Sequence, residues 1–321
     1  MPSVTFSDSV VELQNQETVL DGLLRTGHDI PNGCKAGACQ SCLLIAEDTN
    51  LPATATSGLS ESQKQLGVFK SCCLIPAEDI FVKSADDLIQ RDTVALLEKD
   101  MLNDSVIRLR FETAMGYFSG QYLTLWKDNT VARSYSIAST PDEPYLEFHL
   151  RHYPEGQFSH WAYTDLKVGD QIQIQGPMGN CFYTRPENET DLLLCASGTG
   201  FAPLYGILRE ALQQKHRGKI QLLFAGRNYE DLYYLEELQQ LAEAYDSFSY
   251  QLITLEEGVG QAVQADIYEY VKNEFSNLKG NRIYICGAES FVKKLKKQCF
   301  LAGANMQDIF TDSFVSFQPG S

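Results

Sequence analysis

The sequence has no apolar run approaching the roughly 20 residues that a membrane-spanning helix needs. Its first residues, MPSVTFSDSV, lack both the basic region and the apolar region of a secretory signal. We also find no internal repeat and no low-complexity tract. These absences lead us to expect a cytoplasmic chain with no membrane association.

Basic residues are scarce, since 26 Lys and Arg stand against 42 Asp and Glu, giving a formal net charge of −16. Binding to nucleic-acid phosphates needs clustered positive charge, so we expect no nucleic-acid partner. Acidity of this kind can also serve solubility alone. The first 90 residues are the most acidic per residue, because 5 Lys/Arg and 12 Asp/Glu leave −7.

The nine cysteines are an odd number, which does not suit a framework of paired disulfides. In a reducing compartment, thiols are more often metal ligands or small buried side chains.

The length of 321 residues with 44% hydrophobic content predicts two or three domains.

Three patterns of hydrophobic and polar residues follow one another along the chain. A strand hairpin and a helix ending at Gly27 open the sequence, and the charged stretch at 84–92 is typical of a linker. Short alternating runs then extend to about Arg185 and predict an antiparallel β-barrel. Beyond Asp191, buried strands alternate with helices, as in a doubly wound parallel sheet. The predicted domains are 1–88, 89–187 and 188–321.

A cysteine-rich loop lies in the first segment. Cys34, Cys39 and Cys42 have the spacing C-x4-C-x2-C, which is the plant-type [2Fe-2S] pattern. Glycine and alanine around them allow the backbone to approach the sulfurs of a cluster, and a distant cysteine, Cys72 or Cys73, can close the cage. A zinc site or unrelated buried cysteines are the alternatives, but structural zinc usually shows two C-x2-C pairs and this chain has one.

The barrel segment contains a candidate flavin site. Arg133, Ser134, Tyr135 and Ser136 end a predicted strand, and a glycine turn follows at 156–159. A flavin needs an aromatic face, hydrogen-bond partners for its ring and donors for its phosphates, and these residues supply all three. Taken alone, the R-x-Y-S match is short, and Tyr135 can equally be part of the barrel core.

The third segment contains a candidate nucleotide turn. A buried strand at 192–196 runs into Gly198, Thr199 and Gly200, and a helix follows. Such a turn presents backbone N–H groups and a helix dipole to a phosphate, although a plain strand-to-helix turn is the alternative. Cys286 and Gly287 follow another buried strand, where Cys286 can be either a site residue or a small core residue.

Taken together, these motifs resemble the three-domain reductases of bacterial multicomponent oxygenases. The loop GCKAGACQSC with GVFKSCCLIP is similar to their plant-type ferredoxin domain. The resemblance implies a β-grasp fold there and Cys34, Cys39, Cys42 and Cys72 as cluster ligands. Cys73 departs from the family, which more often has a polar residue at that position, so an exchange between Cys72 and Cys73 stays open.

The second and third segments are similar to the flavin and nucleotide domains of ferredoxin-NADP reductases. The resemblance implies that Arg133 binds phosphate, Tyr135 lies against the isoalloxazine and Ser136 hydrogen-bonds near N5. It implies FAD, with its adenine side contacted by His149, Leu150 and Arg151 and its pyrophosphate held by Gly156, Gln157, Phe158 and Ser159.

The same resemblance assigns the nicotinamide dinucleotide to the turn GTGFAP and to Cys286–Gly287. The chain departs from the family after Gly287, where Ala288 replaces the usual proline. Phe314 is a candidate cover for the flavin ring, with core packing as the alternative. Arg227 lies where relatives that use NADPH hold the 2′-phosphate, yet reductases that use NADH also carry arginine there, so we expect NADH, with NADPH possible.

The function that the resemblance implies is electron transfer from NAD(P)H through FAD and a [2Fe-2S] cluster to a terminal oxygenase or other oxidised metalloprotein, by a monomer. Ser136 and Cys286 are the implied catalytic residues. The alternatives are a reductase for another acceptor, such as a deoxysugar dehydratase, and a redox-sensing binding protein. We expect the acceptor to dock beside the cysteine loop.

Overall fold

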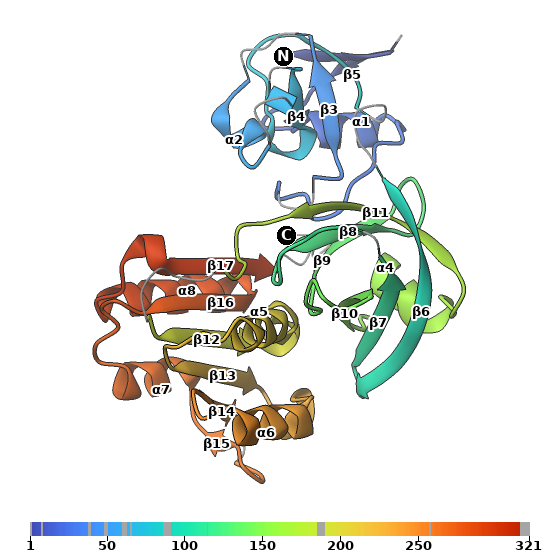
Figure 1. The fold of residues 1–321 in the computed structure, drawn as a ribbon. Helices are drawn as coiled ribbons and strands as arrows, with labels where there is room; N and C mark the ends of the chain where they lie inside the picture. Colours follow the sequence, from blue (N-terminus) through green and yellow to red (C-terminus); the bar gives the residue numbers. More distant parts are fainter. Residues whose placement is uncertain are drawn as a thin grey trace.

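The computed structural model describes residues 2–7, 9–37, 40–47, 51–59, 63–64, 66–85, 91–113, 115–184, 190–256 and 258–314. Three sheets organise these residues, one in each third of the chain (Figure 1). The predicted boundaries near 88 and 187 lie outside the described residues. Within the described residues, no helix is long and apolar enough to cross a membrane.

The N-terminal sheet has the order β2-β1-β5-β3-β4, with β1 parallel to β5 and its other neighbours antiparallel. Helix α1 packs on it through Val19, Leu20 and Leu23 and begins at a Thr18 N-cap that accepts a hydrogen bond from the Asp21 amide. A sheet crossed by one helix in this way is the predicted β-grasp. Its elements are β1 (Ser3–Phe6), β2 (Ser9–Glu12), α1 (Val19–Arg25), β3 (Leu43–Ala46), α2 (Ala53–Thr56), β4 (Val68–Lys70), η1 (Ser71–Cys73) and β5 (Ile80–Ser84).

The middle sheet is antiparallel throughout, in the order β10-β7-β6-β11-β8-β9. An isolated bridge from Ile137 to Phe148 links the two outer strands, so the sheet closes on itself as a barrel. Inward side chains from its strands and from α4 fill the interior. The elements are β6 (Asp92–Asn103), β7 (Val106–Glu112), β8 (Tyr122–Trp126), β9 (Ala132–Ser136), β10 (Tyr145–Arg151), α4 (Gln157–Thr164) and β11 (Gln171–Met178).

The C-terminal sheet is parallel, in the order β15-β14-β13-β12-β16-β17. Successive residues of β12 point to opposite faces: Leu194 packs with α5 and α6, and Cys195 packs with α7 and α8. Both faces are therefore covered, as predicted for a doubly wound fold. The elements are β12 (Leu192–Ser197), η3 (Gly198–Gly200), α5 (Phe201–Gln213), β13 (Ile220–Gly226), η4 (Tyr229–Asp231), α6 (Leu235–Ala244), β14 (Phe248–Thr254), β15 (Val263–Gln264), α7 (Ile267–Glu274), β16 (Arg282–Ala288), α8 (Glu289–Leu301), η5 (Met306–Asp308) and β17 (Ile309–Phe314).

Polar contacts join the barrel to the C-terminal domain. Arg209 of α5 donates to Glu143 Oε1 at 2.8 Å and to the Ala138 carbonyl at 2.7 Å, and the Ser119 amide donates to Glu210 at 3.1 Å. Bonds of this kind fix the orientation of two domains because each has a defined donor and acceptor geometry.

The N-terminal domain contacts the barrel at its cysteine loop. Asn32, two residues before Cys34, forms a bridge with Val131, which directly precedes β9. In Figure 1 this domain lies above the barrel, on the side of β8 and β11. The loop therefore faces the strand that carries the R-x-Y-S motif.

Candidate functional site

The cysteine loop and the η1 turn bring thiols together. The Ser71 amide and hydroxyl both donate to the Cys42 carbonyl, at 3.1 and 2.8 Å, which holds η1 against the end of the loop. The thiols of Cys42 and Cys72 interact as a result: their contact lowers the pKa of Cys42 and, with burial, raises that of Cys72. Cys34 Sγ accepts from the Ala36 amide at 3.3 Å.

Cys73 lies beside this pair, and its Sγ is 3.6 Å from that of Cys72. It also fills the space under Gly37, since a Cβ added at Gly37 would lie 2.5 Å from Cys73 Sγ. Gly37 has φ +76°, a conformation that favours glycine. The contact between Cys42 and Cys72 favours Cys72 over Cys73 as the fourth ligand, which stays a prediction.

The pairing of these cysteines is compatible with the ligation of a [2Fe-2S] cluster. Among the described residues, no three Cys, His, Asp or Glu side chains converge closely enough to hold one ion. A [2Fe-2S] cluster needs two cysteines at each of two irons, so pairs rather than triads should converge. Cys42 and Cys72 form such a pair, Cys34 lies on the same loop, and Cys39 lies outside the described residues.

The R-x-Y-S motif occupies β9. Tyr135 packs against Phe158 of α4, with ring centroids 5.4 Å apart, and burial raises its pKa. The Ser134 hydroxyl lies 3.2 Å from that of Thr124, which directs it away from Tyr135 on the alternating strand. Arg133 Nη1 donates to the Ala132 carbonyl at 2.7 Å. Among the described residues this is the hydrogen bond that the guanidinium forms, so four of its five N–H donors stay available to a phosphate.

Ser136 makes a contact that the sequence did not reveal. Its Oγ donates to Asp312 Oδ2 of β17 at 2.6 Å, so the barrel and the C-terminal domain meet at this hydroxyl. Burial raises the pKa of Asp312 to about 6, although the bond from Ser136 acts to lower it. A half-buried carboxyl with a perturbed pKa beside a predicted catalytic serine is a candidate functional group.

Helix α4 begins at the predicted pyrophosphate turn. Gly156 is its N-cap and forms no side-chain cap, so no capping side chain accepts from the first-turn amides of Gln157 and Phe158. A Cβ at Gly156 would lie 2.3 Å from Ser159 Oγ, so a larger residue there would require the Ser159 hydroxyl to move. A helix N-terminus without a side-chain cap fits an anionic pyrophosphate. The Phe158 side chain itself belongs to the barrel core.

The residues predicted on the adenine side divide into two groups. Leu150 and His149 are buried, and the His149 nitrogens are engaged by Glu147 at 3.0 Å and by the Tyr233 hydroxyl at 3.1 Å. Burial lowers the pKa of His149, although the contact with Glu147 acts to raise it. Arg151 is half-buried and donates to Asp231 at 3.0 Å. The adenine contact stays a prediction, and Arg151 is the residue of this trio with an accessible charged group.

The glycine turn lies between β12 and α5. A Cβ at Gly200 would lie 2.0 Å from the Cys286 carbonyl, so the turn packs directly on the end of β16. Gly198 has φ +55°, and Thr199 is half-exposed beside it. Helix α5 has no side-chain cap, which leaves its first amides for a phosphate.

An acidic partner of Arg227 emerges from the neighbouring strand. Arg227 Nε lies 2.5 Å from Glu256 Oε1, and Glu256 follows β14 by two residues. The Arg227 amide donates to Asp231 at 3.0 Å. Sequence reasoning missed Glu256, although the carboxyl ends of adjacent parallel strands meet at one edge of a sheet and this could have indicated it.

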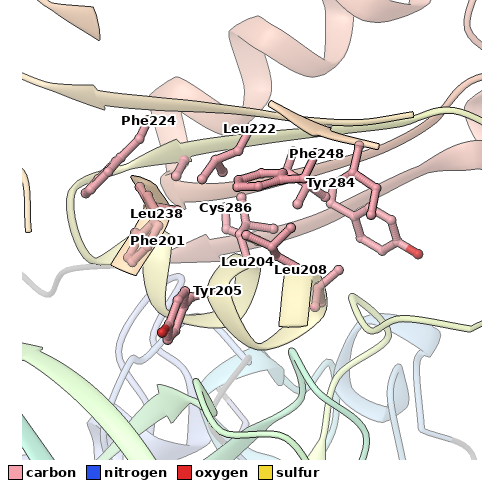
Figure 2. Close-up of a cluster of buried hydrophobic side chains, with 14 of the residues drawn as sticks. Phe201, Leu204, Tyr205, Leu208, Leu222, Phe224, Leu238, Phe248, Tyr284 and Cys286 are labelled. Carbon is pink, nitrogen blue, oxygen red and sulfur yellow. The ribbon is translucent and has the colours of Figure 1, made fainter. Parts of the chain in front are cut away.

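Cys286 is fully buried, and Figure 2 shows it among apolar side chains such as Leu204 and Tyr284. Its Sγ lies 3.7 Å from that of Cys181, and burial raises its pKa. Gly287 follows with φ +148° and packs on the Ser197 carbonyl. Phe314 is half-buried and lies two residues beyond Asp312, so it projects from the same face of β17 as the Ser136 partner.

Comparison with known proteins assigns a family model to each third of the chain. Residues 4–77 match the 2Fe-2S iron-sulfur cluster binding domain. Residues 93–183 match the oxidoreductase FAD-binding domain, and residues 194–297 match the oxidoreductase NAD-binding domain.

Relatives match over most of the chain. The reductase subunit of an aromatic O-demethylase from an Amycolatopsis species is 32% identical over 268 residues, 77% of this chain and 80% of that protein. The reductase component of a naphthalene 1,2-dioxygenase system from Pseudomonas putida is 26% identical over 317 residues, 96% of both chains. A crystal structure of a cytochrome P450 reductase from Amycolatopsis has the same fold, with a TM-score of 0.69, 24% identity and coverage of 98% and 99%.

The order of the three domain matches, the length of the shared alignment and the cofactor types agree with the resemblance found in the motifs. The chain therefore belongs to the family of three-domain flavin and iron–sulfur NAD(P)H reductases, which includes reductase components of aromatic dioxygenase systems.

Proposed function

We propose that this chain takes electron pairs from NADH and delivers them singly to a terminal oxygenase. The observation that carries the proposal is the position of β9. Its first end touches the cysteine loop through Val131 and Asn32, and its last residue, Ser136, touches the nucleotide domain through Asp312. One strand thus connects the site of entry of electrons with the site of exit.

The cofactors supply the redox chemistry, since a flavin accepts hydride and can release electrons one at a time to an iron–sulfur cluster. The chain binds and orients them. Tyr135 would support the flavin ring, Arg133 and the α4 amides would hold its phosphates, and Cys34, Cys39, Cys42 and Cys72 would hold the cluster.

Beside the flavin ring, Asp312 would hold the proton of the Ser136 hydroxyl. Because that hydroxyl donates to Asp312, its oxygen could accept a hydrogen bond from a protonated ring nitrogen. Buried Cys286 lies in the strand next to Asp312, where it shapes the floor of the nicotinamide site.

For the donor, the geometry supports NADH over NADPH. Glu256 pairs with Arg227 and places a negative charge where a 2′-phosphate would approach. A carboxylate there favours ribose hydroxyls, which donate hydrogen bonds, and repels a phosphate. Arg227 is three-quarters exposed and Glu256 nearly half, so this preference should be sensitive to salt.

For the acceptor, we propose docking on the N-terminal domain at the part of the cysteine loop that does not face the barrel. Asn32 already contacts Val131, so the acceptor must approach from another side of the same loop. The excess of acidic residues in the first 90 positions would attract a partner with a basic patch. We further propose that the chain acts as a monomer without a nucleic-acid partner, with domains 1–88, 89–187 and 188–321.

The proposal is tested by cofactor analysis and turnover. The purified protein should contain iron and FAD in a ratio of two irons to one flavin, and NADH should reduce both under anaerobic conditions. It should then reduce cytochrome c, used as a one-electron acceptor in place of the partner. Zinc in place of iron, or flavin reduction without cytochrome c reduction, would contradict the proposal.

A further inference from the structure

A buried lysine lies directly beneath the cysteine loop. Lys70 ends β4, is 3% exposed and precedes Cys72 by two residues. A Cβ placed on Gly37 would lie 3.1 Å from Lys70 Nζ and 3.6 Å from its Cδ, so the aliphatic stem runs under Gly37 and the ammonium reaches past it.

The partner of this ammonium is neutral. Lys70 Nζ donates to the Ser57 hydroxyl at 3.1 Å, and among the described residues no carboxylate forms an ion pair with it. Lys35, on the same loop, is different, because Asp21 neutralises it at 2.8 Å. A buried charge without a counter-charge is unfavourable, whereas methionine or leucine would fill this space at no such cost. The position therefore calls for an anion that the described side chains do not provide.

A [2Fe-2S] cluster would provide that anion. Four thiolates and two sulfides outweigh the charge of two ferric ions, so the cluster is negative and becomes more negative by one charge on reduction. A Cβ at Gly37 would lie 3.1 Å from Lys70 Nζ and 2.5 Å from Cys73 Sγ, and Cys73 Sγ is 3.6 Å from Cys72 Sγ. The ammonium therefore lies within about 10 Å of the Cys72 sulfur. In a protein interior, a unit charge at this distance can change a one-electron equilibrium about tenfold.

We infer that Lys70 is a positioning charge that raises the reduction potential of the cluster and so favours transfer of electrons from the flavin to it. The inference rests on the proposed function, because it needs a cluster in the loop. Net charge and hydrogen bonds around the sulfurs set the potential of such clusters, and Lys70 contributes the charge.

The experiment is a redox titration of the cluster, followed by its electron paramagnetic resonance signal, in the full chain with its cofactors. Lys70→Met and Lys70→Gln both remove the charge, so one can replace the other if it assembles poorly. Both should lower the midpoint potential by about 59 mV or more, the equivalent of a tenfold change for one electron. Lys70→Arg keeps the charge and should stay near the parent.

The matched control is Lys83→Met, which removes the same charge from an exposed position on β5 of the same domain. Its potential should stay close to that of the parent. If the neutral variants at position 70 bind iron normally and their potential matches that of the control, the inference about Lys70 is wrong while the proposed function stands. A parent protein without iron would instead reject the proposed function.

Discussion

Replacing Asp312 with asparagine should make the protein more stable above pH 6 and, at the same time, a poorer catalyst. Burial raises the pKa of Asp312 from 3.8 to about 6, and Ser136 donates to it across the domain interface. A carboxyl with a raised pKa in the folded state stabilises the fold below the pKa of the unfolded chain, and this contribution is lost as pH rises through the folded pKa. Asparagine does not titrate and avoids that loss.

The size of the effect follows from the pKa change. About two pKa units at 1.36 kcal/mol each give at most about 3 kcal/mol, of which roughly half should develop between pH 5 and pH 7.5. Asparagine also weakens the bond from Ser136, because an ionised acceptor contributes about 1.5–3 kcal/mol and a neutral one about half. Hydride transfer from NADH should therefore slow by about tenfold if that bond orients Ser136 at the flavin.

Two measurements check this prediction. Urea unfolding of parent and Asp312→Asn at several pH values above the isoelectric region gives the difference in unfolding free energy, which should grow in favour of the variant as pH rises. Stopped-flow reduction of the flavin by NADH should show a transition near pH 6 in the parent and a flat profile in the variant. Asp246→Asn, at an exposed turn, is the control for loss of one negative charge.

A stability difference that does not change with pH would refute the raised pKa of Asp312. Unchanged flavin reduction, with the expected stability change, would show instead that the Ser136–Asp312 bond joins the domains without serving the reaction.

Three further predictions concern the cluster, the donor and the domain interface. Cys72→Ser should abolish the visible absorption of the cluster and retain the flavin, whereas Cys73→Ser should retain both; the reverse pattern in absorption spectra would assign the ligand to Cys73. Glu256→Gln should raise the ratio of kcat/KM for NADPH over NADH about tenfold in steady-state assays, and Glu269→Gln, which removes another exposed ion-paired carboxylate, should leave it unchanged. Burial opposes ionisation of Glu147, but His149 and the Arg110 guanidinium outweigh this effect and lower the pKa of Glu147 to about 2. Glu147→Gln should therefore cost at most about 3 kcal/mol of unfolding free energy near pH 7. In urea titrations, this loss should become smaller as pH falls from 4.5 toward 2.

Most of the fold could be predicted because each third of the chain has its own periodicity. Buried runs such as the one at 192–196 became the central strand β12, and alternating runs became the barrel. Boundaries were harder to predict. Helix α6 begins only at Leu235, because Tyr234 adopts a left-handed conformation with φ +59° and its hydroxyl donates to Glu147 in the barrel. A tertiary contact of this kind leaves no local pattern in the sequence.

The candidate site could likewise be predicted only in part from the sequence. The cysteines and the R-x-Y-S motif have spacings that reflect local chemistry, so the sequence indicates them. Asp312 and Glu256 act on residues 176 and 29 positions away, and no spacing connects them to their partners. Lys70 was also missed, since a lysine side chain is usually exposed and only the packing under Gly37 shows that this one is buried.

The length of β9 explains how one chain can hold two cofactor sites at a fixed separation. From Val131 to Ser136 the strand advances five residues, or about 17 Å at the usual rise of an antiparallel strand. Its register is fixed on one side by β8, where Leu123 faces Tyr135, and a shift of one residue would turn Tyr135 and Ser136 to the opposite faces. Such a shift would also move Val131 away from Asn32. The contact with the cysteine loop and the contact with Asp312 therefore depend on the same strand pairing, which means that damage to the barrel at β8 should impair flavin reduction and cluster reduction together, even though the two cofactors lie in different domains.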